Sequence, residues 1–437
     1  STQELTGEND FQGDVNLIND GDDDDNTLVM NFVDGATNTV NAQDGTEFGF
    51  KTPSDAGDIT FDGDITGLNS DDGIGPDKII LSQRGPGDIT LTGDLSGFTA
   101  LRIASEGSII DETGDDAFAD LDITVDEGAF LEIDSGDFSK GITGDGGVKI
   151  NGDVSFTDEA KEFKGSTVLQ SGGSIDLQVA DAIANSSEVE FNGGDLTAST
   201  DQTLNSVSGS KTNSNLNINN DSTVTINDLT INDLSERTLG ASLNVDGDST
   251  LTFNQSSGDA VLTGTLSGDG NLEKSGSSRL TLDNNANNSI GQISVNDGTF
   301  ELKGETSLDG DVTVASDAIF RGGNGEINGD VTNNGTFSPG NSVGEITVRD
   351  YKGDGELRFE FVSGGNNTIA ASDTIIVNGT ANLGTTDLTK QDLLIAELTS
   401  PTNQPNNDFP DTILQDNSSS SGAIKGFFKN IDFDTNT

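Results

Sequence analysis

The chain of 437 residues contains no cysteine and no histidine. Without these side chains it can form no disulfide bond, and it cannot assemble a Ser–His–Asp or Cys–His catalytic centre of its own. Zinc sites built on histidine are excluded for the same reason. Serine proteases are therefore removed from the classes of function open to this chain.

Aromatic and apolar residues are also scarce. There is no tryptophan, a single tyrosine (Tyr351), and only 31% of the residues are hydrophobic, which is low for a compact enzyme of this length. Paired carboxylates can hydrolyse glycosides, but with 76 acidic residues such pairs are expected by chance. Sugar-degrading grooves usually stack sugar rings on Trp or Tyr. We therefore predict a non-enzymatic protein and keep a polysaccharide-degrading enzyme as a minor alternative.

Basic residues are also few: the chain has 20 basic and 76 acidic residues, which gives a net charge of −56. Phosphate-rich partners would be repelled along the whole surface, so nucleic acid is excluded as a partner. Anionic lipid is disfavoured for the same reason. No apolar segment approaches the roughly 18 residues that a spanning helix needs, so we predict no direct membrane insertion by this chain.

What the sequence does contain is a pattern of short strands and sharp turns, clearest between residues 262 and 304. Residues 280–282, 293–295 and 300–302 each predict one strand with alternate side chains pointing inward. Gly and Asn between them supply the positive-φ corners of tight turns. Such strands stack into a solenoid, whose narrow core needs few apolar residues.

Weak internal repeats support stacked coils. Residues 57–67 return at 87–97, an offset of 30, and residues 221–226 return at 248–253, an offset of 27. The tetrapeptide at 151–154 recurs at 328–331. Offsets that drift in this way predict coils whose loops vary in length while the strands stay aligned.

The stretch 262–304 is similar to the autotransporter-associated β-strand repeat. The matching residues are Gly264, Leu266, Gly268, Gly270, Leu272, Lys274, Gly276, Leu280, Leu282, Asn285, Gly291, Val295, Gly298, Phe300 and Leu302. A second group of segments resembles the C-terminal part of autotransporter passengers, namely residues 334–344, 356–360, 373–379 and 426–428. The resemblance implies export to the surface of a Gram-negative bacterium and a C-terminal region that helps passenger folding.

These observations predict an all-β fold, namely an elongated, right-handed parallel β-helix. A single chain winds through all of its coils, which makes it a single-stranded β-solenoid. We expect the solenoid over residues 1–340 and a cap resembling an autochaperone over 341–437, with a loop rich in Pro, Asn and Ser at 400–422. Residues 158–164 and 179–184 are predicted to be short helical turns or irregular loops. The glycine cluster at 322–325 is predicted to be a solenoid corner.

Calcium is the one cofactor for which the sequence offers a candidate site. Five carboxylates fall within residues 20–25, and hard cations favour such oxygen clusters. The candidate ligands are Asp20, Asp22, Asp23, Asp24 and Asp25. Smaller acidic groups lie at Asp71, Asp72 and Asp77, and at Asp115 and Asp116. The alternative is that each is a solvated acidic loop.

The sequence therefore predicts a secreted, structural or adhesive protein at the cell surface, acting as an adhesin or stalk of the autotransporter-passenger type. Its partners would be a host or neighbouring-cell surface, or other copies of itself. The alternative is a self-assembling subunit of an extracellular filament, appendage or surface layer.

Overall fold

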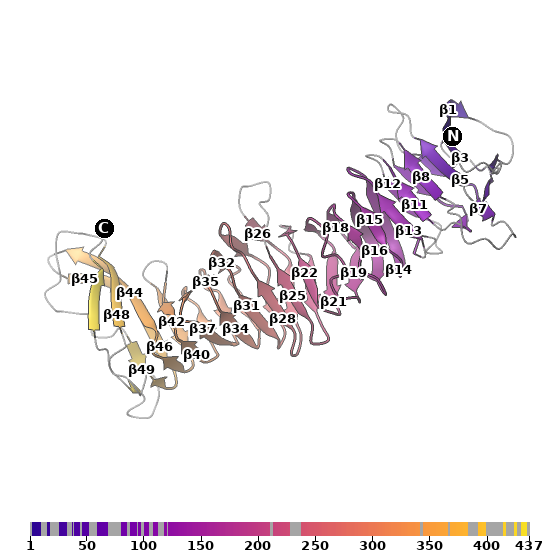
Figure 1. Ribbon diagram of the computed structural model, residues 1–437. Coiled ribbons are helices and arrows are strands. Elements are labelled where there is room, and N and C mark those ends of the chain that lie inside the picture. The colour runs from indigo at the N-terminus through magenta and orange to yellow at the C-terminus, as the bar shows by residue number, and fades with distance from the viewer. Residues whose placement is uncertain are drawn as a thin grey trace. The chain divides into compact units, whose positions relative to one another are not determined.

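The computed structural model describes residues 121–209, 213–227, 237–340, 344–365 and 368–382 without interruption. Before residue 121 and after residue 382 it describes strands and a few connecting residues. The contacts between residues divide the chain into two compact units, Ser1–Val207 and Ser208–Thr437. Among the described residues all regular structure is β-strand, and the parallel β-helix predicted from the sequence is confirmed (Figure 1).

The first unit contains three sheets. The β1 sheet comprises β1 (Thr2–Asn9), β3 (Asn26–Phe32), β5 (Thr46–Lys51), β8 (Ile80–Arg84), β11 (Ala100–Ile103), β13 (Asp122–Val125), β15 (Ile142–Gly144) and β17 (Glu162–Phe163). The β2 sheet comprises β2 (Val15–Leu17), β4 (Val40–Gln43), β7 (Ile65–Leu68) and β10 (Leu95–Ser96). The β6 sheet comprises β6 (Ile59–Phe61), β9 (Ile89–Leu91), β12 (Ser108–Asp111), β14 (Phe130–Phe138), β16 (Gly147–Phe156), β18 (Thr167–Gln170), β19 (Ser174–Leu177), β20 (Val189–Asn192) and β21 (Asp195–Ala198). The strands β22 (Gln202–Leu204) and β23 (Val207–Ser208) follow.

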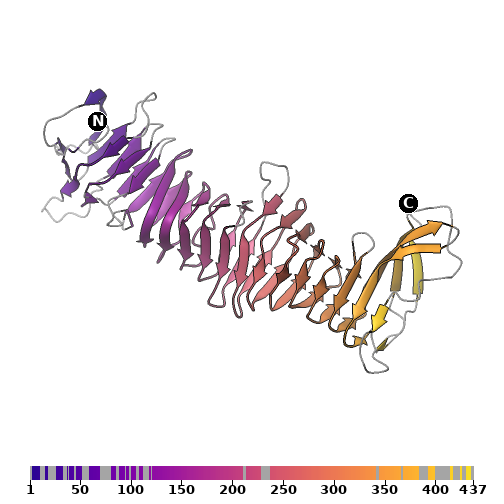
Figure 2. The same cartoon turned by 180° about the vertical axis from the view of Figure 1, so that it is seen from behind.

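The second unit has four sets of stacked strands, and Figure 2 shows these coils from behind. The β24 set is β24 (Asn215–Ile218), β27 (Ser242–Val245) and β30 (Leu266–Ser267). The β25 set is β25 (Thr223–Ile226), β28 (Thr250–Phe253), β31 (Asn271–Lys274), β34 (Gln292–Val295), β37 (Asp311–Val314), β40 (Val331–Asn333), β43 (Tyr351–Gly353), β47 (Ala381–Asn382) and β50 (Ile424–Lys425). The β26 sheet is β26 (Arg237–Leu239), β29 (Ala260–Leu262), β32 (Arg279–Leu282), β35 (Gly298–Leu302), β38 (Ala318–Arg321), β41 (Thr336–Ser338), β44 (Glu356–Gly365), β48 (Asp392–Leu398) and β51 (Asn430–Asp434), with β45 (Thr368–Ser372) antiparallel to β44. The β33 sheet is β33 (Asn287–Asn288), β36 (Ser307–Leu308), β39 (Glu326–Ile327), β42 (Glu345–Val348), β46 (Thr374–Val377) and β49 (Leu414–Asp416).

The predicted repeats correspond to neighbouring coils. Ile59 pairs with Ile89 at the offset of 30, and Thr223 pairs with Thr250 at the offset of 27. In the later coils the spacing falls to about 20, as in the pairing of Leu280 with Phe300. The strands therefore stay aligned while the connecting loops change length. The two copies of the tetrapeptide at 151–154 and 328–331 fall in different units and mark no neighbouring coils.

The core is a set of apolar ladders inside the coils. In the β25 set, Leu251, Leu272 and Ile293 occupy equivalent inward positions on successive coils, and all are buried. In the β26 sheet, the rings of Phe300 and Phe320 lie 6.0 Å apart and those of Phe320 and Phe337 lie 5.0 Å apart. Each buried side chain of this kind contributes about 1.5–3 kcal/mol, and the ladder repeats that contribution on every coil.

Several sequence predictions can be compared with the structure at single segments. Ile293 and Val295 of β34 are buried on either side of a partly exposed Ser294, as the predicted alternation requires. Neither predicted segment contains a helix: residues 179–184 form a bend and turn, and residues 158–161 are irregular. Within 158–164 the prediction was wrong at residues 162–163, which form strand β17. The cluster at 322–325 is a corner, because a Cβ atom at Gly323 would lie 2.6 Å from the carbonyl oxygen of Gly304.

The strands beyond residue 340 continue the parallel pairing, since β46 pairs with β42 and β47 pairs with β43. Strand β49 lies within the stretch 400–422, whose other residues are outside the described part of the chain. The boundary at 340/341 and the capping role of residues 341–437 stay predictions.

Two lysines are buried at corners of the coils. Lys274 is 0% exposed, and its Nζ donates hydrogen bonds to the carbonyl oxygens of Ser275, Gly276 and Asp297, at 2.8, 2.5 and 3.2 Å. An ammonium group has three donors, so each finds a turn carbonyl that has no partner in a sheet. Burial lowers the pKa of Lys274 to about 8, against the opposing charge of Asp297.

Lys161 has the same role in the first unit. Its Nζ donates to the carbonyl oxygens of Phe138 (2.9 Å), Lys140 (2.7 Å) and Thr157 (3.3 Å) and lies 5.5 Å from the ring centre of Phe156. Burial also lowers its pKa to about 8, opposed by the charges of Glu159 and Asp158. Buried lysines therefore join turns of neighbouring coils in both units.

Replacement of glycine at a corner should reveal how closely the coils approach. A Cβ atom at Gly268 (φ +105°) would lie 2.1 Å from the carbonyl oxygen of Val245. At Gly247 (φ +56°), a Cβ atom would meet only Asp221 Oδ1, at 3.8 Å. We expect Gly247→Ala to lower the free energy of unfolding by about 1–2 kcal/mol through backbone strain alone. Gly268→Ala should cost about 1–3 kcal/mol more because the coils must separate. Equal losses in urea unfolding would contradict this account.

The buried lysines predict a pH dependence of stability. Lys274 releases its proton near pH 8 in the folded protein, whereas an unperturbed lysine does so at 10.5. Between these values the unfolded chain binds the additional proton, so the free energy of unfolding gains a contribution that rises with pH. Relative to Lys274→Met, the wild type should gain stability from pH 8 to 10.5 and hold a constant difference below pH 8. Lys352→Met, at an exposed lysine, is the control, and a flat difference for Lys274→Met across this range would contradict the prediction.

Candidate functional site

The predicted calcium ligands Asp20, Asp22, Asp23, Asp24 and Asp25 lie outside the described residues. The smaller acidic groups at positions 71, 72 and 77 and at 115 and 116 also lie outside them. Within the part of the chain that the structure describes, no group of three or more carboxylates is placed to hold a metal ion. Calcium binding stays a prediction for the acidic run at 20–25.

The described charges gather instead on the outer face of the β26 sheet, in the second unit. Along β29, β32, β35, β38 and β44, charged residues at the outward positions and beside the strand ends alternate with buried Leu and Phe residues. We call this set the charged strip. It consists of Asp259, Arg279, Asp283, Asp297, Glu301, Lys303, Asp317, Arg321, Glu356 and Arg358.

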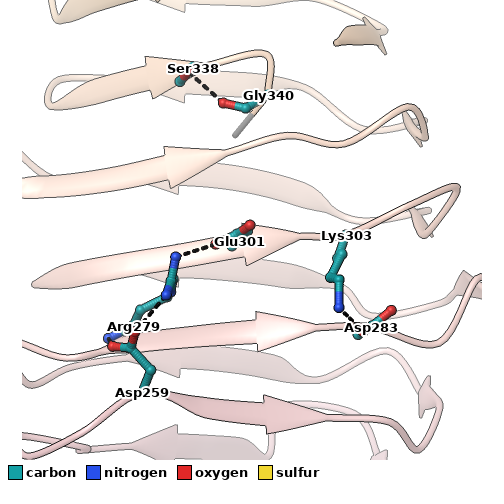
Figure 3. A network of polar contacts seen from close by, with 7 residues as sticks. All are labelled: Asp259, Arg279, Asp283, Glu301, Lys303, Ser338 and Gly340. Atoms are coloured by element: carbon teal, nitrogen blue, oxygen red, sulfur yellow. Dashed lines mark hydrogen bonds and ion pairs between the residues drawn. The ribbon is translucent and has the colours of Figure 1, made fainter. Parts of the chain in front are cut away.

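Arg279 links three successive coils of the charged strip (Figure 3). Its Nη2 lies 2.6 Å from Asp259 Oδ2 on the preceding coil, and its Nη1 lies 3.1 Å from Glu301 Oε2 on the following coil. Burial disfavours the charged guanidinium, but the hydrogen bond to Asp259 and the charges of Glu301 and Asp259 outweigh it and raise the pKa of Arg279. The arginine therefore stays charged.

Glu301 is the buried member of this group. Its side chain is only 7% exposed although it lies on the outer face, and Arg321 is its direct neighbour in the register of β35 and β38. Thr281, its neighbour on the other side, is also buried. The predicted alternation leaves Thr281 and Glu301 on the outward side of their strands, and both are nevertheless buried.

A second ion pair lies beside Arg279. Lys303 Nζ is 2.6 Å from Asp283 Oδ2, again between neighbouring coils, and the lysine side chain is 62% exposed (Figure 3). On β44, Arg358 Nη2 lies 3.1 Å from Glu356 Oε1 within one strand. Ser338, on β41 between these pairs, donates its hydroxyl hydrogen to the carbonyl oxygen of Gly340 at 3.0 Å.

Pairing between coils is a general use of the few basic residues. In the first unit Lys149 pairs with Glu132 and Lys164 with Asp145, both at 2.6 Å. In the second unit Arg349 contacts Asp330 at 2.7 Å and Asp311 at 3.4 Å on the two preceding coils. Basic side chains thus relieve the repulsion between acidic coils, chiefly at the positions where the coils stack.

The charged strip offers polar and electrostatic contacts. The paired groups present fixed charges and hydrogen-bonding atoms on one face. Sequence analysis missed this strip because its members lie about 20 residues apart. A search for opposite charges at the coil spacing of 20–22 residues would have found the Asp259–Arg279–Glu301 series.

Loss of the buried ion pair between Arg279 and Glu301 should lower the free energy of unfolding more than loss of the exposed pair between Lys303 and Asp283. Arg279→Met leaves the carboxylate of Glu301 without its hydrogen-bonded partner, so we expect the free energy of unfolding to fall by about 1.5–3 kcal/mol. Lys303→Met removes an exposed pair with Asp283 and should cost about 0–1 kcal/mol. Urea unfolding of the two variants makes the comparison. If Lys303→Met proved as costly as Arg279→Met, burial of Glu301 would not be the cause.

Among the described residues, no helix has both the length and the apolar character needed to cross a membrane. No family model, no curated protein and no solved structure matches the chain. The resemblance to autotransporter repeats stays a prediction, so the proposals below rest on the fold and on the geometry of the described residues.

Proposed function

We propose that this chain is a non-enzymatic structural and adhesive protein of the autotransporter-passenger type, displayed at the surface of a Gram-negative bacterium. The observation that carries the proposal is how the coils are bonded to one another. Apolar side chains fill inner ladders, and six basic side chains (Arg102, Lys149, Lys164, Arg279, Lys303 and Arg349) pair with acids on neighbouring coils. Each coil is stabilised by its neighbours, which suits a scaffold that presents an extended polar surface.

The residues that carry the family resemblance support this proposal through their structural roles. Gly264, Gly268 and Gly270 lie where a Cβ atom would collide with the backbone of the preceding coil, at 1.9, 2.1 and 2.7 Å from its carbonyl oxygens. Lys274 closes a corner from inside. These positions favour a coil that stacks closely on its neighbour.

The outer surface supports a recognition function based on polar contacts. Along the β25 set the partly exposed outward positions include Thr225, Thr252, Ser294, Thr313 and Thr332, one on each of several coils. Glu273 takes the equivalent position on β31 and interrupts this series. Hydroxyl groups of this kind can hydrogen-bond to polar polymers on a host or neighbouring cell. The net charge of −56 favours neutral or cationic groups in such a partner.

Adhesion can be tested with beads that carry the purified chain. We expect folded chain to attach beads to host or bacterial cells, and beads coated with the unfolded chain to attach less. The unfolded control has the same composition and charge but lacks the ordered surface. Equal attachment by folded and unfolded chain would contradict an adhesive role for the coils. Release of oligosaccharides from a panel of polysaccharides would instead support an enzyme.

A further inference from the structure

Asparagine is followed two positions later by serine or threonine, with a residue other than proline between them, at eight places in the chain. This tripeptide is the acceptor for N-linked sugars, although a chain rich in these residues also contains it by chance. Exposure in the folded chain separates the two cases. The six such asparagines in the described part of the chain are all exposed, namely those at positions 185, 220, 254, 287, 334 and 378. Of the 20 other asparagines whose exposure is described, only seven are exposed, so the tripeptide coincides with exposed asparagine.

The side-chain amide decides which of these six asparagines can react. Four of them have an amide without a hydrogen-bond partner among the described residues, namely Asn185, Asn254, Asn334 and Asn378. Asn287 differs, because its Nδ2 donates to Asp309 Oδ2 on the following coil at 2.8 Å. A sugar attached to Asn287 would require this bond between coils to break, whereas the other four nitrogens already point to solvent.

The hydroxyl residue of the tripeptide must also be reached by the enzyme that transfers the sugar. Ser187, Ser256 and Thr380 are exposed, and Thr336 is partly exposed. Ser222, which follows Asn220, is only 3% exposed. The tripeptides that begin at 185, 254, 334 and 378 therefore present both of their recognised side chains, and the one that begins at 220 does not.

One corner of the coils provides a comparison built into the chain. Asn254, Asn296 and Asn334 directly follow β28, β34 and β40, at equivalent positions in the register of the β25 set. The backbone N–H of each donates to a carbonyl oxygen on the preceding coil, at 2.8, 2.8 and 2.9 Å. All three are exposed, but Asn296 is followed two positions later by glycine. The three sites therefore share a backbone setting and differ in the tripeptide.

We propose that Asn185, Asn254, Asn334 and Asn378 are acceptor sites for N-linked sugars. In the transfer, Nδ2 of the asparagine attacks the anomeric carbon of a sugar carried on a diphosphate, and a C–N bond forms. The bond from that carbon to the diphosphate oxygen breaks, and the diphosphate leaves with the electron pair. Nδ2 gives up one proton to a base of the transferring enzyme. No oxidant is needed, and this chain acts only as the acceptor.

The sugars would change the outer surface of the coils at their corners. A neutral sugar adds uncharged hydroxyl groups to a chain of net charge −56, and a bulky polar group at a corner leaves the stacking of the strands undisturbed. The assignment does not depend on the proposed adhesive function, because it rests on the tripeptides and on the accessibility of their side chains.

Peptide mapping by mass spectrometry of the full chain, purified from its natural source, tests the assignment. The peptides that contain Asn185, Asn254, Asn334 and Asn378 should be heavier by one or more sugar residues. The same chain made in a host that transfers no sugars to asparagine should have its unmodified mass. Asn296 is the matched control and should be unmodified in both preparations.

Variants at the corner of Asn254 test the tripeptide itself. Ser256→Ala leaves Asn254 in place but removes the exposed hydroxyl, so the sugar on Asn254 should be lost, whereas Ser256→Thr should retain it. Circular dichroism shows that both variants are folded. Unmodified asparagine at all four sites, a sugar on Asn296, a sugar kept on Asn254 in Ser256→Ala, or sugars attached only to hydroxyl groups would overturn the proposal. Bead adhesion by the chain from the host without sugar transfer tests the proposed function separately.

Discussion

The structure depends on the parallel register between successive coils. That register places Phe300, Phe320 and Phe337 in one column inside the β26 sheet. Because strand side chains alternate with a period of two, a slip of one residue would move such a column to the outer face. Backbone hydrogen bonds between coils and apolar ladders within them therefore favour the same alignment. A chain with few apolar residues can fold in this way because its core is only one coil wide.

The same register determines which charged side chains lie next to one another on successive coils. A chain of net charge −56 opposes its own compaction, and its 20 basic residues must be placed where they relieve the most repulsion. Arg279 and Arg349 do this by spanning three coils each. Salt bridges on an exposed surface are usually weak, but here they lie along the axis on which the coils stack.

Corners of the coils impose a separate requirement. A turn carbonyl that points into the stack has no strand partner, and burying it unpaired would be costly. Lys274 donates to three turn oxygens, whereas two of the three oxygens that accept from Lys161, those of Phe138 and Thr157, also accept from a backbone N–H. Asn288 acts in a similar way, because its Oδ1 accepts from the backbone N–H of Leu266 and its Nδ2 donates to the carbonyl oxygen of Ser307. Buried polar side chains thus hold neighbouring coils together where the sheets end.

The sequence by itself determined the strand segments, the glycine corners and the coil spacing in the regions that repeat visibly. Alternation at 293–295 and the offsets of 30 and 27 are local or repeated signals, and each corresponds to a structural feature. Only the tertiary structure decided which side chains from different coils meet. The burial of Glu301, the partners of Arg279 and the inward direction of Lys274 depend on residues about 20 positions apart. Because loop lengths vary from coil to coil, that spacing drifts, and no local pattern specifies which charges stack.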